Sequence, residues 1–278
     1  MKYKRLTSQI EFESVGIHTG KLSKIVLKPD QKNSNINFVI NGEFIQANIK
    51  NVVDTTQATS LGNNKIKILT VEHLLSALYC LYLTGVEIDV YGNEIPLMDS
   101  SAGTFVEKII SCGIVDTQKE IEFVKIDKHI KLSINNSSYE VVPSEKFIVN
   151  CKILTPKSKF LNNKEIAIEI TTENFVSQIA YAKTFCLLED VEKIRSKGLG
   201  RGGNINNVIV IDNDKILNPE IVKYKDDEPI RHKILDFLGD LSLTNLYFKA
   251  EFKIVNPSHY TNIEFCKHLL KELCCRFS

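Results

Sequence analysis

The sequence predicts an α+β fold of two domains with like topology. Each is a β-sheet plus two helices, and the domains are expected to pack helix layer to helix layer with a site between them. Short segments of alternating hydrophobic and polar residues form two groups, separated internally by Gly, Asn, Asp and Pro. Each group is followed by segments with apolar residues at helical spacing. Several residues also recur in one order, which indicates an internal repeat. The recurring pairs are His73 with His232, Thr84 with Thr244, Pro96 with Pro257 and Phe105 with Phe265.

The first domain is expected to span residues 1–118. Its predicted strands are 9–15, 22–27, 36–40, 44–49, 65–69 and 86–91, and its predicted helices are 70–83 and 102–112. The polar residues 50–64 are predicted to be a loop, and a domain boundary is predicted within residues 113–120.

The second domain is expected to span residues 121–278, with an inserted segment near 186–211. Its predicted strands are 121–134, 138–142, 147–154, 165–170, 208–211 and 246–255. Its predicted helices are 174–182, 190–197, the helix that carries His232, and 261–274. The glycines at 198–203 follow a helix and precede a strand, the reverse of the order in a dinucleotide-binding turn, so they predict a helix C-cap and a turn.

Composition excludes several classes of protein. The 278 residues are 43% hydrophobic and 25% charged, and the net charge of +1 comes from scattered residues, so no nucleic-acid partner is predicted. The seven cysteines show no Cys-x-x-Cys spacing and are expected to be reduced thiols. No apolar run reaches the roughly 18 residues of a membrane span, and no apolar segment of a signal peptide follows the first residues. We expect a cytoplasmic monomer.

The helix that carries His232 presents possible metal ligands. Its apolar residues lie on one side, and His232, Asp236 and Asp240 follow four apart on the other. Side chains at i and i+4 are neighbours, so His232 and Asp236 can converge on one ion. Taken alone, this spacing more often belongs to an amphipathic helix with a solvated polar stripe. The equivalent helix of the repeat adds His73. Two imidazoles and one carboxylate leave a tetrahedral position open, which is typical of catalytic zinc, with Fe²⁺ as a second possibility in the cell.

Other polar residues are candidates for proton transfer and binding. Glu72 precedes His73 and could take a proton from an attacking water, although first-turn glutamates are common. His259, in the proline loop of the second repeat, could act as an acid or stabilise an oxyanion. Thr184 could donate to an oxyanion, and Lys233 could bind a phosphate. His18, in a glycine-flanked turn, is a weaker candidate, and His129 and His268 are expected at the surface.

Taken together, these residues resemble a known family. The motifs are Gly-Ile-His-Thr-Gly at 16–20, Thr-Val-Glu-His-Leu at 70–74, Ile-Pro-Leu-Met-Asp at 95–99, Lys-Thr-Phe at 183–185, Arg-His-Lys-Ile-Leu-Asp at 231–236, Gly-Asp at 239–240, and His259 with Asn262. In this order and spacing they resemble the UDP-3-O-acyl-N-acetylglucosamine deacetylases, the zinc amidases of lipid A synthesis. The resemblance spans nearly the whole chain.

The resemblance implies a role for each matched residue. It implies one Zn²⁺ bound by His73, His232 and Asp236, with Glu72 as general base and His259 as general acid. It further implies Thr184 at the oxyanion, Lys233 and Phe185 against the substrate, and Asp240 beside His259. The substrate would be UDP-3-O-acyl-N-acetylglucosamine, with its acyl chain in a passage formed near 186–211. The apolar residues expected to line this passage are Val191, Val208 and Val210.

The chain departs from the family pattern in a few places. Lys183 stands where the family usually has arginine, and Arg201 and Asn204 put polar groups into the inserted segment, which leaves the acyl length open.

Two alternatives also stay open. A two-histidine, one-carboxylate set also describes non-haem Fe(II) oxygenases, although those usually carry His-x-Asp on a strand. A non-catalytic sugar-nucleotide binding module is the other, and it would need no Glu72 beside the metal.

Overall fold

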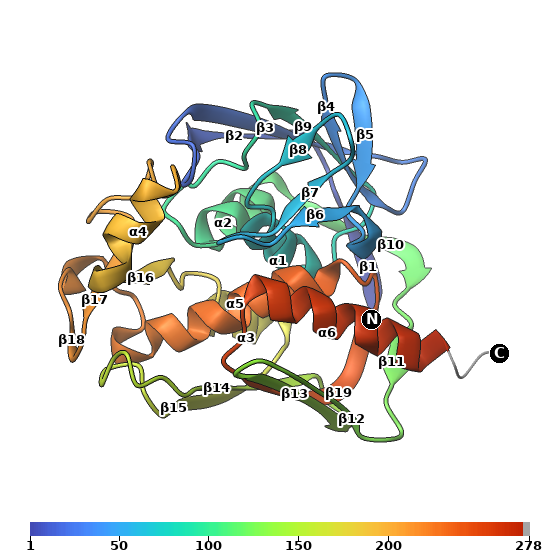
Figure 1. The fold of residues 1–278 in the computed structure, drawn as a ribbon. Coiled ribbons are helices and arrows are strands. Elements are labelled where there is room, and N and C mark those ends of the chain that lie inside the picture. The colour runs from blue at the N-terminus through green and yellow to red at the C-terminus, as the bar shows by residue number, and fades with distance from the viewer. Residues whose placement is uncertain (275–278) are drawn as a thin grey trace.

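The computed structural model describes residues 1–274, in which two β-sheets lie on either side of a layer of helices (Figure 1). The first sheet has the order β2-β3-β9-β4-β5, and the second has the order β12-β13-β19-β14-β15, with β11 also paired to β19. The first sheet comprises β2 Ile10–Val15, β3 Leu22–Pro29, β4 Ile36–Ile40, β5 Glu43–Gln46 and β9 Val86–Tyr91. The second comprises β11 Phe123–Lys125, β12 Ile130–Ile134, β13 Ser137–Pro143, β14 Ile148–Ile153, β15 Lys164–Glu169 and β19 Tyr247–Val255.

The two sheets share one topology. In the first, β9 runs antiparallel to β3 and parallel to β4. In the second, β19 has the same relation to β13 and β14. Each central strand lies between two helices in sequence: α1 Glu72–Cys80 and α2 Gly103–Cys112 flank β9, and α5 Glu228–Ser242 and α6 His259–Cys274 flank β19. This correspondence confirms the predicted α+β fold with repeated topology.

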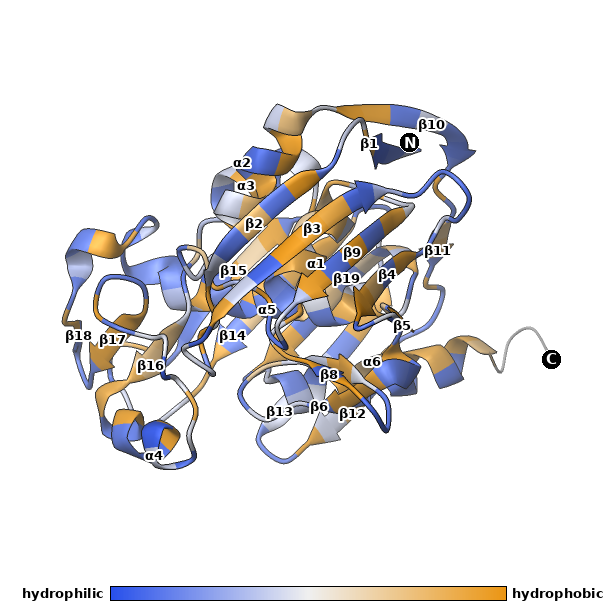
Figure 2. Ribbon diagram, turned by 90° about the horizontal axis from the view of Figure 1, so that it is seen from above, coloured by the Kyte–Doolittle hydropathy of each residue, from blue (hydrophilic) through white to orange (hydrophobic). Residues whose placement is uncertain are grey.

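Alternating hydropathy explains why one face of each sheet is covered. Along β2, hydrophobic and hydrophilic residues alternate (Figure 2), and Ile10 and Phe12 are buried while Glu11 and Glu13 are exposed. Successive side chains of a strand point to opposite faces, so this pattern places one face of the sheet against the protein interior and leaves the other in solvent. The central strands β9 and β19 bury their apolar side chains against the helix layer.

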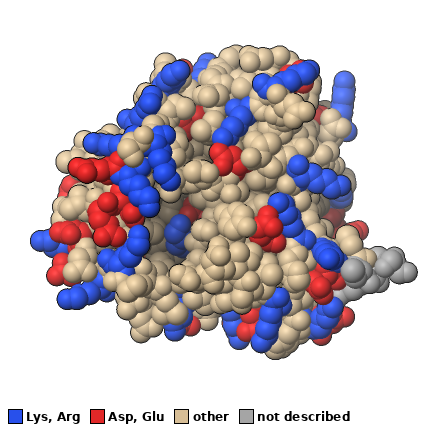
Figure 3. Space-filling view, viewed as in Figure 1, with Lys and Arg blue, Asp and Glu red and all other residues tan. Residues whose placement is uncertain are grey.

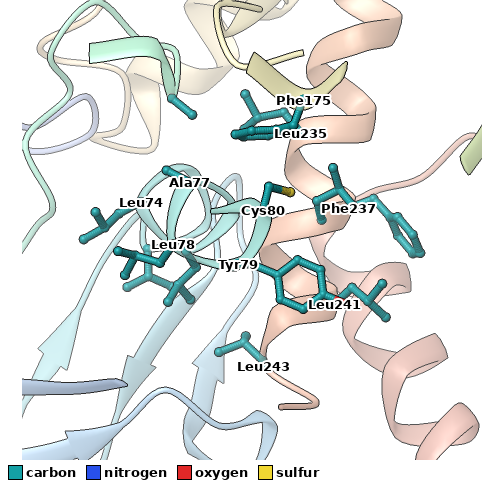
Figure 4. Packing of buried hydrophobic residues seen from close by; sticks show 14 of the residues in the cluster. Leu74, Ala77, Leu78, Tyr79, Cys80, Phe175, Leu235, Phe237, Leu241 and Leu243 are labelled. Atoms are coloured by element: carbon teal, nitrogen blue, oxygen red, sulfur yellow. The ribbon is translucent and has the colours of Figure 1, made fainter. Parts of the chain in front are cut away.

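The helix layer forms one continuous core with both sheets. Leu74, Ala77 and Leu78 of α1 are fully buried, as are Leu235 and Phe237 of α5 (Figure 4). Burying a side chain such as leucine or phenylalanine contributes about 1.5–3 kcal/mol. Packing therefore fixes α1 against α5, and these are the two helices that carry the candidate ligands.

A smaller unit projects from the second sheet. It contains β16 Phe185–Leu187, α4 Val191–Ser196, β17 Ile209–Asp212 and β18 Lys215–Ile216, and β16, β17 and β18 form a three-stranded sheet. Helix α3 Thr172–Gln178 precedes it. After α4, Gly198 and Gly200 have φ values of 76° and 67°, a conformation that glycine adopts readily. The predicted C-cap and turn are thereby confirmed.

Several predicted boundaries are wrong. The segment 50–64 is not a loop throughout, because β6 Val52–Asp54 and β7 Ser60–Gly62 pair there and β8 Lys67–Ile68 extends the sheet. The predicted strand 121–134 is interrupted between β11 and β12. Residues 114–120 form β10, which pairs with β1 Lys2–Leu6. Strands of two or three residues are too short to show alternation, and β10 is largely exposed. The division into domains 1–118 and 121–278 stays a prediction.

Two further findings concern residues 1–274 as a whole. None of the helices in residues 1–274 is long and apolar enough to cross a membrane. The six cysteines within this range are free thiols, and the seventh, Cys275, lies outside the described residues.

Candidate active site

The first turn of α1 lies directly against α5. The close approach depends on Gly239, because a Cβ atom there would lie 2.2 Å from the Glu72 carbonyl oxygen. Only glycine allows two backbones to approach so closely. The contact brings His73, at the start of α1, beside the polar side of α5.

Three side chains converge at this contact. Ligand atoms of His73, His232 and Asp236 all lie within 4.8 Å of one another, and all three residues are buried. The Asp236 Oδ1 atom is 3.3 Å from His232 Nε2 and 3.6 Å from His73 Nε2. The structure thus brings together the three ligand candidates from the sequence.

The chemistry of this cluster fits a bound cation. Asp236 Oδ1 is buried and has no hydrogen-bond partner among the described residues. His232 Nδ1 lies 3.1 Å from the Ala182 carbonyl oxygen, which fixes the ring and leaves Nε2 facing the cluster. Burial lowers the pKa of His232 to about 3, against the opposing effect of Asp236, so its ring is neutral and able to ligate. Burial would raise the pKa of Asp236, but His232, Lys233 and His259 outweigh it and hold that pKa well below the usual range.

Glu72 lies beside the cluster and is held by the backbone of Thr59. The Thr59 N–H donates to Glu72 Oε2 at 3.0 Å, and Glu72 Oε1 is 3.8 Å from His259 Nε2. Burial raises the pKa of Glu72, against the opposing effects of His259 and His73. A carboxylate with a raised pKa is a stronger base.

His259 forms the opposite side of the site with Asp240. It is the first residue of α6, which corrects its predicted place in the proline loop, because the helix begins earlier than the apolar pattern indicates. Its Nδ1 lies 3.0 Å from Asp240 Oδ2, which also accepts from Asn262 Nδ2 at 2.8 Å. Burial would lower the pKa of His259, but Asp240, Glu72 and Asp236 outweigh it and raise the pKa to about 9.

These groups lie in a cavity of about 670 Å³ between the two halves of the molecule. A hollow is visible beside charged side chains on the α4 side of the surface (Figure 3). The predicted site residues on its wall are Glu72, His73, Thr184, Phe185, Val191, Val208, Val210, His232, Lys233, Asp236 and His259. Asp240 is fully buried behind His259.

Two of the candidate residues, one catalytic and one substrate-binding, already have partners. The Thr184 hydroxyl donates to the Ser100 carbonyl oxygen at 3.2 Å. Lys233 Nζ donates to Asp236 Oδ2 at 3.1 Å and lies 5.5 Å from the centre of the Phe185 ring. Lys233 therefore reaches the cavity along an aromatic face.

Sequence reasoning missed two buried residues that organise the site. Thr59 donates its N–H to Glu72 and its hydroxyl to Asp240, and Glu94 accepts hydrogen bonds from the turn at residues 16–20. Both contacts join distant parts of the chain, so no local pattern could indicate them. His18 lines the cavity, whereas His129 is exposed and its Nδ1 atom lies 3.1 Å from Glu140 Oε1.

A buried cluster of two histidines and an aspartate, flanked by a glutamate and a second histidine–aspartate pair, is the set of catalytic groups found in metal-dependent hydrolases. Comparisons with known proteins identify the family. A family model described as UDP-3-O-acyl N-acetylglycosamine deacetylase (LpxC) matches residues 3–271.

Three relatives are proteins named UDP-3-O-acyl-N-acetylglucosamine deacetylase. The protein of Aquifex aeolicus is 35% identical over 97% of this chain and 93% of its own length. That of Campylobacter fetus is 33% identical over 98% and 92%, and that of Thermodesulfovibrio yellowstonii is 35% identical over 98% and 92%. The chain belongs to the UDP-3-O-acyl-N-acetylglucosamine deacetylase family. This membership confirms the resemblance and favours neither an Fe(II) oxygenase nor a non-catalytic binding module.

Proposed function

We propose that this protein hydrolyses the 2-acetamido group of UDP-3-O-acyl-N-acetylglucosamine, releasing acetate and a free amine for lipid A synthesis. The observation that carries the proposal is the buried Asp236 Oδ1 atom, which lies near the imidazoles of His73 and His232 and has no hydrogen-bond partner among residues 1–274. Asp236 lines the same cavity as Glu72 and His259, and the wall of this cavity extends to apolar residues of α4 and β17.

We propose Zn²⁺ as the resident ion, held by His73, His232 and Asp236. Two neutral imidazoles and one carboxylate suit zinc, and Fe²⁺ accepts the same set. Bound there, the cation would polarise the amide carbonyl and make water more acidic.

Glu72 would take the proton of the attacking water. Its burial, which raises its pKa, supports this role. The Thr59 N–H occupies Oε2, so Oε1 is the oxygen free to accept the proton.

His259 would deliver a proton to the leaving nitrogen. The Asp240 carboxylate at Nδ1 supports a protonated ring, with Nε2 facing Glu72 across 3.8 Å. The acid and base would therefore act from neighbouring positions on one cavity wall.

The remaining residues would bind and orient the substrate. Thr184 would donate to the oxyanion, which requires its hydroxyl to turn away from the Ser100 carbonyl oxygen. Lys233 and Phe185 would contact the sugar nucleotide. The acyl chain would follow Val191, Val208 and Val210, which line the cavity. The cytoplasmic location and the monomeric state stay predictions.

The proposal is tested by acetate release from an acylated UDP-N-acetylglucosamine. Purified protein should release acetate, lose this activity to a chelator and regain it when zinc is added. No release by the zinc-loaded protein, or full activity after complete removal of metal, would contradict the proposal.

A further inference from the structure

Glu94 is a buried carboxylate that the proposed chemistry does not use. Glu94 follows the end of β9 in the chain, and it is only 1% exposed. Oε1 accepts from the His18 N–H at 2.8 Å, and Oε2 accepts from the Thr19 N–H at 2.9 Å and the Thr19 hydroxyl at 2.6 Å. The Thr70 hydroxyl also donates a hydrogen bond to Glu94 Oε1, at 3.1 Å. No lysine or arginine within residues 1–274 forms an ion pair with Glu94. Four neutral donors therefore satisfy both of its oxygens.

Three of the four donors belong to one turn, residues 16–20. The sequence of this turn is built around the carboxylate, because a Cβ atom on Gly16 would lie 2.0 Å from Glu94 Oε2. The fourth donor, Thr70, has φ +62°, a conformation that is rare for a β-branched residue and must be held by its surroundings. Glu94 thus determines the shape of the turn and supports the residue that leads into α1.

The turn at residues 16–20 is hydrogen-bonded to residues 201–202, which follow α4. The Gly202 N–H donates to the Ile17 carbonyl oxygen at 3.0 Å, and the Arg201 N–H donates to the His18 carbonyl oxygen at 3.3 Å. A Cβ atom on Gly202 would lie 2.3 Å from the Gly16 carbonyl oxygen, so the two backbones are in direct contact. These contacts link the first half of the chain to the inserted segment of the second.

The turn also contributes to the cavity wall. Ile17 packs with Leu97 and Val208 in a small buried apolar cluster, and Ile17, His18 and Val208 all line the cavity. A displacement of the turn would therefore alter the apolar wall and the position of Val208. Within residues 1–274, the side chains of the ligand cluster on α1 and α5 form no hydrogen bond or ion pair with residues 201–202.

We propose that Glu94 is a positioning residue, which holds the 16–20 turn and through it residues 201–202, and so maintains the part of the wall that selects the acyl chain. The role of Glu94 in acyl-chain selectivity rests on the proposed function. The coupling between Glu94 and residues 201–202 is independent of the proposed function.

The test compares Glu94→Gln with Glu13→Gln, the same substitution at an exposed position on β2. Glutamine retains the size of Glu94 but turns one acceptor oxygen into a donor facing other donors. Loss of a buried acceptor should weaken the turn and lower the kcat/KM ratio for long-acyl over short-acyl substrate by at least about fivefold. The change should arise mainly in the KM for the long-acyl substrate, with metal content unchanged. Thr19→Val, which removes a single donor and leaves Thr70 in place, should act in the same direction more weakly.

Amide hydrogen exchange measures the coupling without reference to activity. In Glu94→Gln, the amides of residues 17–19 and 201–202 should exchange faster, while those of β19 keep their protection. Unchanged protection at 201–202 would overturn the coupling, and an equal loss of kcat/KM for both substrates would overturn the role in selectivity. If the unmodified protein releases no acetate from either substrate, the proposed function fails, and the exchange result still decides the coupling.

Discussion

Replacing Asp240 with asparagine tests the proton-donor role of His259. Asparagine has almost the same size as aspartate, and its oxygen can still accept from His259 and Asn262. Its amide can donate to the Thr59 hydroxyl, which now donates to Asp240. The substitution therefore removes the negative charge while the hydrogen bonds adapt.

The expected shift follows from the distance between the two groups. Asp240 Oδ2 lies 3.0 Å from His259 Nδ1, and an opposite charge at such a distance typically shifts a pKa by about 1–3 units. The pKa of His259 is raised to about 9, so Asp240→Asn should bring it to roughly 6–8. A bound metal dication would lower the pKa in both proteins, so the direction of the difference is preserved.

The assay is the pH dependence of kcat/KM with zinc-loaded protein. His259 can act as an acid only while protonated, so a lower pKa should move the alkaline limb of the profile to lower pH and reduce the plateau. Asp116→Asn, at an exposed position on β10, is the matched control and should leave the profile unchanged. An alkaline limb that stays in place or moves to higher pH in Asp240→Asn would refute the pairing with His259.

Three further predictions concern the metal, the base and the acyl chain. His232→Ala should lose most of its bound zinc in metal analysis, and undiminished zinc with full activity would remove His232 from the ligand set. Glu72→Gln should keep its metal but lose about 10²–10⁴-fold in kcat, as is typical when a general base is lost, and unchanged turnover of the metal-loaded variant would exclude this role. Each methylene removed from the acyl chain should weaken binding by up to ~0.8 kcal/mol, seen as a fall in kcat/KM. Equal kcat/KM for acylated and non-acylated substrates would count against an apolar passage.

The sequence predicted the parts of the site that depend on local spacing. His232 and Asp236 are one helical turn apart on α5, and Glu72 adjoins His73 on α1, so their proximity follows from helix geometry. The recurrence of residues between the halves predicted that the two helices correspond, and the two sheets have matching strand orders.

The contacts that sequence reasoning missed join residues far apart in the chain. Thr59 reaches Asp240, and Glu94 reaches the turn at 16–20, through pairings that depend on how the sheets and helices assemble. Neither a buried threonine nor a glutamate after a strand has a distinctive local pattern. Likewise, β1 and β10 pair across the first half of the chain, and most of β10 faces solvent, so hydropathy does not mark it as a strand.

The most direct test of the metal centre is a crystal structure of the zinc-loaded protein with anomalous diffraction data at the zinc edge. We expect one strong anomalous peak between His73 Nε2, His232 Nε2 and Asp236 Oδ1, about 2.0–2.2 Å from each of these atoms. The absence of a peak at this position, or zinc bound only elsewhere in a fully active preparation, would contradict the assignment of the catalytic centre.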